Sequence, residues 1–178
     1  WADVAKLHGV HSSKGKVLHF VRSYETWGGP EQLVEQVYRL DLPRITNSEQ
    51  LAARLPIPPL GTIHNGLDDE FAELPDRLTD EKTHLTTGLL YRLQDWKRMD
   101  DALEVLTKLK SKHSNMRVVI FGEAIKRQHE PLLKQLGHCE FIKQPSGSEL
   151  CQVFSKLDVF LFTSDETEAF GNPPLEAM

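Results

Sequence analysis

One stretch of the chain, residues 158–178, decides the fold and reads Asp-Val-Phe-Leu-Phe-Thr-Ser-Asp-Glu-Thr-Glu-Ala-Phe-Gly-Asn-Pro-Pro-Leu-Glu-Ala-Met. Its apolar beginning, residues 159–162, is rich in β-branched and aromatic residues, which is typical of a buried strand. A polar loop follows, in which Gly171 allows the backbone to turn tightly or to approach a ligand. Pro173 and Pro174 suit the first turn of a helix, where no hydrogen-bonded N–H group is lost. The stretch therefore predicts a strand, a loop and a helix start, an arrangement that can bind an anion.

Two carboxylates, Glu168 and Glu176, bracket this loop with seven residues between them. The string of residues 168–178 resembles the Glu-x7-Glu signature of the retaining family 4 (group 1) glycosyltransferases, enzymes of the GT-B architecture with two facing Rossmann-like domains. The resemblance implies that Glu168 lies beside the donor sugar as a catalytic residue and that Glu176 holds the ribose of the nucleotide. It also implies that the backbone after Glu168 faces the sugar and the phosphate, at Phe170, Gly171 and Asn172. From the residues alone, Glu176 is also explained as a carboxylate that stabilises a helix dipole.

A basic loop from Arg92 to Lys97 follows a predicted strand at residues 87–91. It resembles the family's Gly-Arg-x4-Lys-Gly loop, whose Arg and Lys grip the donor diphosphate, and this implies binding and catalytic roles for both residues. Ligands of parallel sheets bind beyond the carboxyl ends of the strands, so we expect Arg92, Lys97 and Glu168 to project from one such edge. Without the resemblance, the loop is equally well explained as a solvated basic surface.

The chain departs from the family pattern at four positions. Tyr91 replaces the usual Gly before the Arg, and Arg98 replaces the Gly after the Lys, which adds positive charge to the loop. Ala169 replaces a Gly, and Asn172 stands where the family favours an apolar residue. The resemblance therefore implies no particular donor sugar.

The composition narrows the class of protein. The chain has 178 residues, enough for one domain or parts of two, and 39% of them are hydrophobic. Its net charge of −5 argues against a dedicated nucleic-acid binder, and no apolar run approaches the ~20 residues of a membrane span. Cys139 and Cys151 form no Cys-x-x-Cys motif, so we interpret both as reduced packing residues. We expect a protein of the cytoplasm, either free or at the inner face of the membrane through regions outside this chain.

Strands and helices alternate along the chain, which predicts βαβ units and parallel sheets, an α/β fold. The predicted strands are residues 16–22, 45–46, 60–64, 87–91, 117–121, 140–142 and 159–162. The predicted helices are residues 30–38, 48–55, 99–112, 128–136 and 148–156, two of them capped by Ser48 and Ser148.

The resemblance implies a division of this α/β chain into parts of two Rossmann-like domains of a GT-B enzyme. Residues 1–69 would be the rear part of the N-terminal, acceptor-side domain, residues 70–84 a charged linker, and residues 85–178 the front part of the C-terminal, nucleotide-sugar donor domain. The chain starts at Trp1 without a cap signal and stops at Met178 a few residues into a predicted helix that would not persist alone. We therefore expect an interior piece of a longer protein.

The first half resembles the family more weakly, through the Asn65-Gly66 turn that leads into the family's linker. The family's acceptor-side loop often carries a His just after the first strand. Arg22 stands near that place, so no such His is carried over, and His19 within the strand is interpreted as a packed residue.

The resemblance implies transfer of a sugar, with retention of the anomeric configuration, from a nucleotide sugar to a carbohydrate or a lipid-linked acceptor, as in polysaccharide biosynthesis. Negative charge grows on the leaving diphosphate, where Arg92, Lys97 and helix N–H groups can stabilise it. No obligatory metal or other cofactor is implied. The sequence has no Asp-x-Asp motif, and His8 and His11 are interpreted as parts of a surface loop.

Three alternatives stay open from the residues alone. A glycosidase would use Glu168 and Glu176 as two carboxylates across a sugar bond. A nucleotide-sugar epimerase shares the two-domain architecture, and a non-catalytic GT-B-like module could bind a nucleotide sugar without turnover. The absence of a Gly-x-Gly-x-x-Gly motif after any predicted strand argues against dinucleotide binding.

Overall fold

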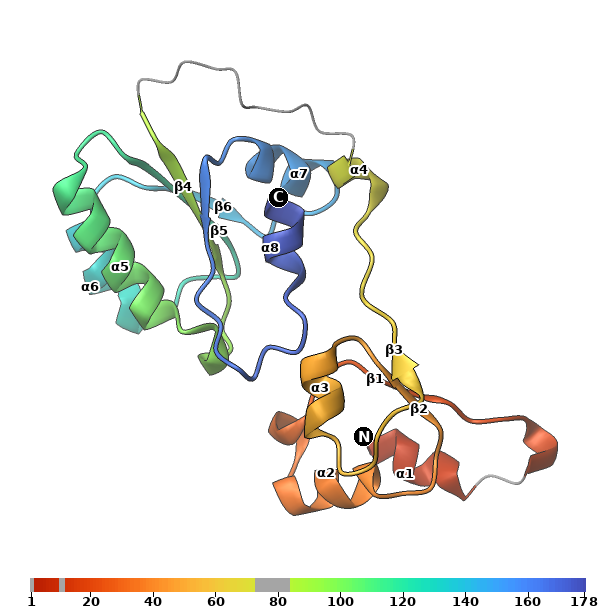
Figure 1. Ribbon diagram of the computed structural model, residues 1–178. Helices are drawn as coiled ribbons and strands as arrows, with labels where there is room; N and C mark the ends of the chain where they lie inside the picture. Colours follow the sequence, from red (N-terminus) through yellow and green to blue (C-terminus); the bar gives the residue numbers. More distant parts are fainter. Residues whose placement is uncertain (1, 10–11, 73–83) are drawn as a thin grey trace. The chain divides into compact units, whose positions relative to one another are not determined.

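The computed structural model describes residues 2–9, 12–72 and 84–178, and it divides the chain into two compact units (Figure 1). The first unit comprises Trp1–Gly66 together with Thr167–Phe170, and the second comprises Leu67–Glu166 together with Gly171–Met178. Both units are α/β with a parallel sheet, as the alternation of strands and helices predicts. Each unit is described by itself.

The first unit contains a three-stranded parallel sheet in the order β1-β2-β3. Its strands are β1 (His19–Val21), β2 (Arg44–Thr46) and β3 (Gly61–Thr62). Its helices are α1 (Ala2–His8), α2 (Glu31–Tyr38) and α3 (Glu49–Arg54), with short 3-10 turns η1 (Ser12–Lys14) and η2 (Thr26–Gly28). Phe20 pairs with Ile45, which in turn pairs with Gly61, so β2 is the central strand.

Two side chains set the helix ends of the first unit. The Ser48 hydroxyl accepts the Leu51 backbone N–H at 3.1 Å, which confirms the predicted cap of α3. The Arg44 guanidinium is buried and donates to the backbone carbonyls of Val37 and Leu40, at 3.1 and 2.6 Å. The Val37 carbonyl, at the end of α2, also accepts the Leu40 N–H at 3.2 Å, and the Leu40 carbonyl accepts the Leu42 N–H at 2.9 Å, so the cation adds a second donor to each carbonyl and offsets the negative end of the helix dipole. The core of the unit follows from these helices and consists of Val21, Val34, Tyr38, Leu51 and Leu55.

The second unit contains a four-stranded parallel sheet in the order β6-β5-β4-β7. Its strands are β4 (Thr86–Tyr91), β5 (Arg117–Gly122), β6 (Glu140–Lys143) and β7 (Val159–Leu161). Its helices are α4 (Asp69–Ala72), α5 (Met99–Lys112), α6 (Glu130–Leu136), α7 (Ser148–Ser155) and α8 (Asn172–Ala177), with 3-10 turns η3 (Asp95–Lys97) and η4 (Arg127–His129).

Helices cover both faces of this sheet: α5 and α6 lie on one face, and α7 and α8 on the other (Figure 1). Alternate residues of β5 divide between the two faces. Val118 and Ile120 join the core under α5, whereas Val119 and Phe121 pack against α7. Because both faces are covered, β4 and β5 are buried along almost their whole length, as expected for inner strands of a parallel sheet.

The structure confirms helix α5 with the predicted bounds and corrects three details. The strand predicted over residues 16–22 is shorter, since only His19–Val21 pairs with β2. Val159 is 45% exposed instead of buried, because β7 stands last in the strand order and, among the described residues, pairs only with β4. Ser148 does not cap α7: it is the first helical residue, and the cap position is Gly147 with φ 53°. Most of the predicted linker, residues 73–83, lies outside the described residues.

The conformation of Gly122 yields a prediction about stability. Its φ is +125°, and a Cβ built there would lie 2.3 Å from the Tyr91 carbonyl oxygen. Gly15 has the same φ of +125° with nothing within 4 Å of such a Cβ, so it is a matched control for backbone strain alone. We expect Gly122→Ala to lower the free energy of unfolding in urea by ~2 kcal/mol more than Gly15→Ala, because the clash is with backbone that cannot rotate away. Equal losses for the two variants would contradict this account of Gly122.

Candidate functional site

The candidate site lies beyond the carboxyl ends of β4 and β7, which are neighbours in the sheet. Leu89 of β4 pairs with Leu161, the last residue of β7. Strand β4 ends at Tyr91, so Arg92 is the first residue to leave the sheet at this edge. Ligands of open parallel sheets bind at this kind of edge, where loops leave the strand ends and helix N-termini lie nearby.

The loop after β4 makes a tight turn that exposes a basic side chain. The Lys97 and Arg98 N–H groups donate to the Gln94 and Asp95 carbonyls at 3.1 and 3.0 Å, which forms the single turn η3. Arg98 then adopts φ 53° and ψ 47°, the left-handed region, and helix α5 starts at the next residue. A non-Gly residue pays ~1–2 kcal/mol to adopt this conformation. A Gly would adopt this conformation without that steric cost.

Residues from two other segments hold this loop in place. The Thr163 hydroxyl donates to the Lys97 carbonyl at 2.9 Å, and the Asp165 N–H donates to the Trp96 carbonyl at 3.0 Å. On the opposite side, the Glu123 carboxylate accepts the Leu93 N–H at 2.8 Å. Thr163 and Glu123 were not among the predicted site residues. They act on loop residues 66 and 30 positions away, so no local sequence pattern marks them.

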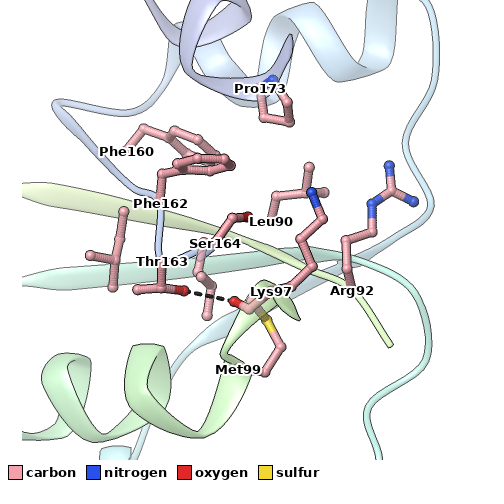
Figure 2. A pocket seen from close by; sticks show the side chains of 11 residues that line it. Leu90, Arg92, Lys97, Met99, Phe160, Phe162, Thr163, Ser164 and Pro173 are labelled. Carbon is pink, nitrogen blue, oxygen red and sulfur yellow. Dashed lines mark hydrogen bonds between the residues drawn. The ribbon is translucent and has the colours of Figure 1, made fainter. Parts of the chain in front are cut away.

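Arg92 and Lys97 line one pocket in this region, with Pro173 of helix α8 on its other side (Figure 2). Figure 2 shows the Arg92 side chain, directly after β4, and the Lys97 side chain, from the turn η3, both extending toward the side on which Pro173 lies. Lys97 Nζ lies 5.7 Å from the centre of the Phe162 ring, in a cation–π contact that limits where the ammonium can go. The remaining wall is mostly apolar, so an anion bound between the two cations would be partly dehydrated, and its attraction to them would be stronger than in water.

The start of α8 contributes less to anion binding than the sequence predicts. Gly171 takes the cap position with φ 79° and ψ 70°, and Asn172 is the first helical residue. The next two residues are Pro173 and Pro174, which have no N–H group to offer a ligand. Of the first three helical positions only Asn172 has a backbone donor, so the positive charge of Arg92 and Lys97 must supply most of the attraction for a phosphate.

Glu176 lies in α8 within electrostatic range of Arg92. Its side chain is half-buried, and burial raises the pKa of this carboxyl above its usual value. The Arg92 guanidinium opposes that shift in the pKa, and the Asp68 carboxylate adds to it. Arg92 therefore lines the pocket and also interacts with the Glu176 carboxylate of helix α8. One ligand could contact Arg92 as a cation and Glu176 as a hydrogen-bond acceptor.

The other predicted residues, Glu168 and Phe170, belong to the first unit. The neighbouring Ala169 packs against the core of that unit, and the Phe170 ring lies 5.5 Å from the His64 ring. The structure thus groups Arg92, Lys97, Gly171, Asn172 and Glu176 in the second unit. The catalytic role of Glu168 and the binding role of Phe170 stay predictions from the resemblance.

A larger hollow lies at the opposite edge of the same sheet, where β4, β5 and β6 begin. The space open to water-sized molecules is about 550 Å³ there, against about 10 Å³ in the pocket of Arg92 and Lys97. Size alone would favour it as the binding site. Amino ends of parallel strands are not where such folds bind their ligands, so the smaller pocket is the better candidate.

The described residues also bear on the metal and membrane predictions. Within residues 2–9, 12–72 and 84–178, no three His, Cys, Asp or Glu side chains are grouped to bind a metal ion. His8 ends helix α1, so it does not lie in the predicted surface loop, and His11 lies outside the described residues. His19 stacks on Tyr38 with ring centres 5.9 Å apart, which confirms its packing role. No helix in the described part of the chain is both long and apolar enough to cross a membrane.

Comparison with known proteins gives a family and a fold. Residues 71–178 match the family described as Glycosyl transferases group 1. A mutant of S. aureus TarM, crystallised in complex with Fondaparinux, alpha-GlcNAc-glycerol and UDP, has a similar structure with a TM-score of 0.73 at 14% identity. A second TarM structure is similar with a TM-score of 0.71 at 13% sequence identity. Each comparison covers 99% of this chain and 37% of TarM, so the chain spans little more than a third of that protein's length. No curated protein gave a significant match.

The burial of Glu176 predicts how stability depends on pH. Since the folded-state pKa is raised, the folded chain holds the proton to a higher pH than the unfolded chain, and ionisation of Glu176 opposes folding near neutral pH. We expect Glu176→Gln to raise the free energy of unfolding at pH 7. The gain should shrink toward zero as the pH falls to ~4, where the carboxyl is protonated in both states. Urea denaturation from pH 4 to 8 measures this difference.

The control for this experiment is Glu104→Gln, which removes one exposed partner of Lys108. Exposed pairs of this kind stabilise by at most ~1 kcal/mol, so the control should never raise stability. If Glu176→Gln behaved like the control at every pH, Glu176 would not be the half-buried carboxylate described here.

Proposed function

Since the chain belongs to the group 1 glycosyl transferases, a family of retaining enzymes, we propose that the full-length protein moves a sugar from a nucleotide sugar to a carbohydrate or lipid-linked acceptor. The anomeric configuration of the sugar is retained in the product. The observation that carries this proposal is the shared pocket of Arg92 and Lys97 beyond the carboxyl end of β4, with Glu176 close to Arg92. Two cations suit the diphosphate of the donor, and a carboxylate suits a ribose hydroxyl.

We further propose that the chain supplies parts of both domains of a GT-B enzyme. Residues 1–69 form the rear of the acceptor-side domain, residues 70–84 the linker, and residues 85–178 the front of the nucleotide-sugar donor domain. The parallel sheet present in each unit and the likeness to 37% of TarM support this division. The presence of UDP in a TarM crystal supports a nucleotide sugar as the donor class.

In the proposed reaction, the bond between the anomeric carbon and the diphosphate breaks, and the new bond forms to the acceptor oxygen on the same face of the sugar. A phosphate oxygen of the donor helps to take the acceptor proton. Arg92 and Lys97 face the leaving diphosphate, where negative charge grows as the bond breaks. Charge stabilisation by groups already in place is usually the largest catalytic term.

Glu176 and Glu168 have different roles in this proposal. The Glu176 carboxylate accepts a hydrogen bond from the ribose, whose charge does not change during the reaction. Its contribution is therefore to donor affinity. Glu168 orients the sugar, and Phe170, Gly171 and Asn172 follow it along the sugar and phosphates. No metal ion takes part, because the two basic side chains neutralise the diphosphate.

A nucleotide panel tests the proposal directly. We expect UDP or another nucleoside diphosphate to raise the melting temperature of the full-length protein, and the matching nucleotide sugar to glycosylate an acceptor. NMR of the product should show the donor's anomeric configuration. An epimerised nucleotide sugar would identify an epimerase, and binding without turnover would identify a non-catalytic module. Absence of nucleotide binding would overturn the proposal.

The division between catalysis and binding predicts two distinct variant phenotypes. Lys97→Ala should lower the single-turnover rate by ~10²-fold, the effect of losing one charged donor in the transition state. Glu176→Gln should chiefly weaken donor binding, by ~1–2 kcal/mol, because a charged hydrogen bond becomes a neutral one. Donor titrations and single-turnover rates separate the two effects, and the exposed Lys112→Ala on α5 is the control. The donor-site assignment fails if Lys97→Ala spares the rate while Glu176→Gln leaves donor affinity unchanged.

The proposed charge arrangement also predicts the effect of metal removal. With Arg92 and Lys97 against the diphosphate, the full-length enzyme should keep most of its activity in excess EDTA. The assay is initial-rate sugar transfer before and after chelation. Loss of activity that Mn²⁺ or Mg²⁺ restores would show that a metal, and not these side chains, neutralises the leaving group.

A further inference from the structure

Tyr91 is the residue that stands where the related enzymes usually have Gly, and its side chain is fully buried although it ends in a hydroxyl. The hydroxyl oxygen accepts the Lys126 backbone N–H at 2.9 Å and lies 2.6 Å from His129 Nδ1. His129 is 2% exposed, and its Nε2 lies 3.0 Å from an Asp100 carboxylate oxygen. Three side chains from three segments are therefore joined in one chain of hydrogen bonds.

The direction of each hydrogen bond follows from the chemistry of the groups. A backbone N–H can only donate and an ionised carboxylate can only accept, so the Tyr91 oxygen accepts from Lys126 and Asp100 accepts from His129 Nε2, which leaves Nδ1 to accept the Tyr91 hydroxyl hydrogen. The neutral imidazole must then carry its hydrogen on Nε2, which donates it to Asp100. The Gln128 side-chain amide lies farther from Nε2, at 3.3 Å. Burial raises the pKa of the Tyr91 hydroxyl, which keeps it protonated and able to donate.

This chain of hydrogen bonds connects the two ends of the basic loop. Tyr91 is the last residue of β4 and directly precedes Arg92. Asp100 is the second residue of α5, which begins where the loop ends at Arg98. His129, from the turn η4, thus bridges the residue before the loop and the first turn of the helix after it.

We propose that Tyr91, His129 and Asp100 are positioning residues, which hold the ends of the 92–98 loop together and so keep Arg92 and Lys97 aligned with their anionic ligand. Their effect on turnover rests on the proposed glycosyltransferase function, whereas their effect on the order of the loop does not. The bridge acts on the side of the loop nearest α5, and the contacts of Thr163 and Asp165 act on the side nearest β7. Removal of the bridge would therefore free the two ends of the loop from each other, while Glu123, Thr163 and Asp165 still hold Leu93, Lys97 and Trp96.

Asp100 offers the cleanest test because its side chain is 72% exposed, so its replacement should not disturb the core. Asp100→Asn keeps a carbonyl oxygen that accepts the Nε2 hydrogen, whereas Asp100→Ala removes the acceptor. Both variants lose the same negative charge from the first turn of α5, so the difference between them isolates the hydrogen bond. Tyr91→Phe cuts the bridge at the other end and keeps the ring.

Amide hydrogen exchange measures the loop without reference to activity. In the full-length protein, we expect residues 92–98 to exchange ~10-fold faster in Asp100→Ala and Tyr91→Phe than in the wild type, with the exchange of β5 unchanged. Asp100→Asn should remain close to the wild type. Unchanged exchange of the loop in Asp100→Ala would overturn the inference, whatever the protein catalyses. A general rise across the unit in Tyr91→Phe, with no loop-specific change in Asp100→Ala, would also overturn it.

Kinetics tests the catalytic consequence. We expect Asp100→Ala and Tyr91→Phe each to lower the single-turnover rate by ~10-fold or more, since small misplacements of catalytic groups cost this much. The double variant should lose little further, because either change cuts the same bridge. Asp100→Asn should retain the rate. If the wild type transfers sugar and Lys97→Ala slows it, the proposed function stands, and a full rate in Asp100→Ala would refute only the positioning role.

Discussion

Strand β4 is hydrogen-bonded on both edges and covered on both faces, and the arrangement of the candidate site depends on this confinement. Six of its residues pair with β5 and three with β7. At Gly88 a Cβ would lie 2.1 Å from the Leu157 side chain, so no side chain fits between the strand and the segment that leads into β7. The end of β4 is therefore fixed in space, and with it the position of Arg92. Because the loop starts from a rigid strand, its basic side chains lose little conformational freedom when they bind a ligand.

The loop itself combines strain with many anchors. Arg98 adopts the left-handed conformation that favours Gly, which costs conformational energy. Its guanidinium forms an ion pair with Asp101 at 2.5 Å. Because this ion pair is exposed, its stabilisation offsets only part of the conformational cost. Hydrogen bonds from Thr163, Asp165 and Glu123 hold the loop from two directions. Strained residues persist where the surroundings determine the backbone, and this often occurs at functional sites. Arg98 thus adds positive charge to a loop whose backbone these hydrogen bonds hold in place.

The sequence predicts the regular parts of the second unit because their signals are local. The apolar face of α5 recurs at helical spacing, and the helix forms with the predicted bounds, Met99–Lys112. The exposure of β7 could not be read in the same way, since it depends on which strand lies last in the sheet. The hydrogen bonds of Thr163 and of His129 join residues 66 and 38 positions apart, and such partners leave no periodicity. The roles of Arg92, Lys97 and Glu176 are predicted by resemblance, and the structure adds that the first two share a pocket and that Arg92 acts on the third.

The two prolines at the start of α8 explain why side-chain charge dominates this edge. A helix N-terminus usually offers several free N–H groups to a phosphate, but Pro173 and Pro174 remove two of them. The two prolines remove backbone N–H donors, but they also make the helix start more rigid, because proline fixes the backbone angle φ in the first turn. Gly171, at φ 79°, supplies the sharp turn that a fixed helix start requires. Arg92 then serves two neighbours at once, the anion pocket and the half-buried Glu176. In the proposed donor complex, the Arg92 charge is shared with the diphosphate, so less of it offsets the burial of Glu176, and a hydrogen bond from the ribose hydroxyl replaces that contribution. Under the proposed function, occupation of the pocket by the diphosphate and hydrogen bonding at Glu176 would be coupled through this one guanidinium.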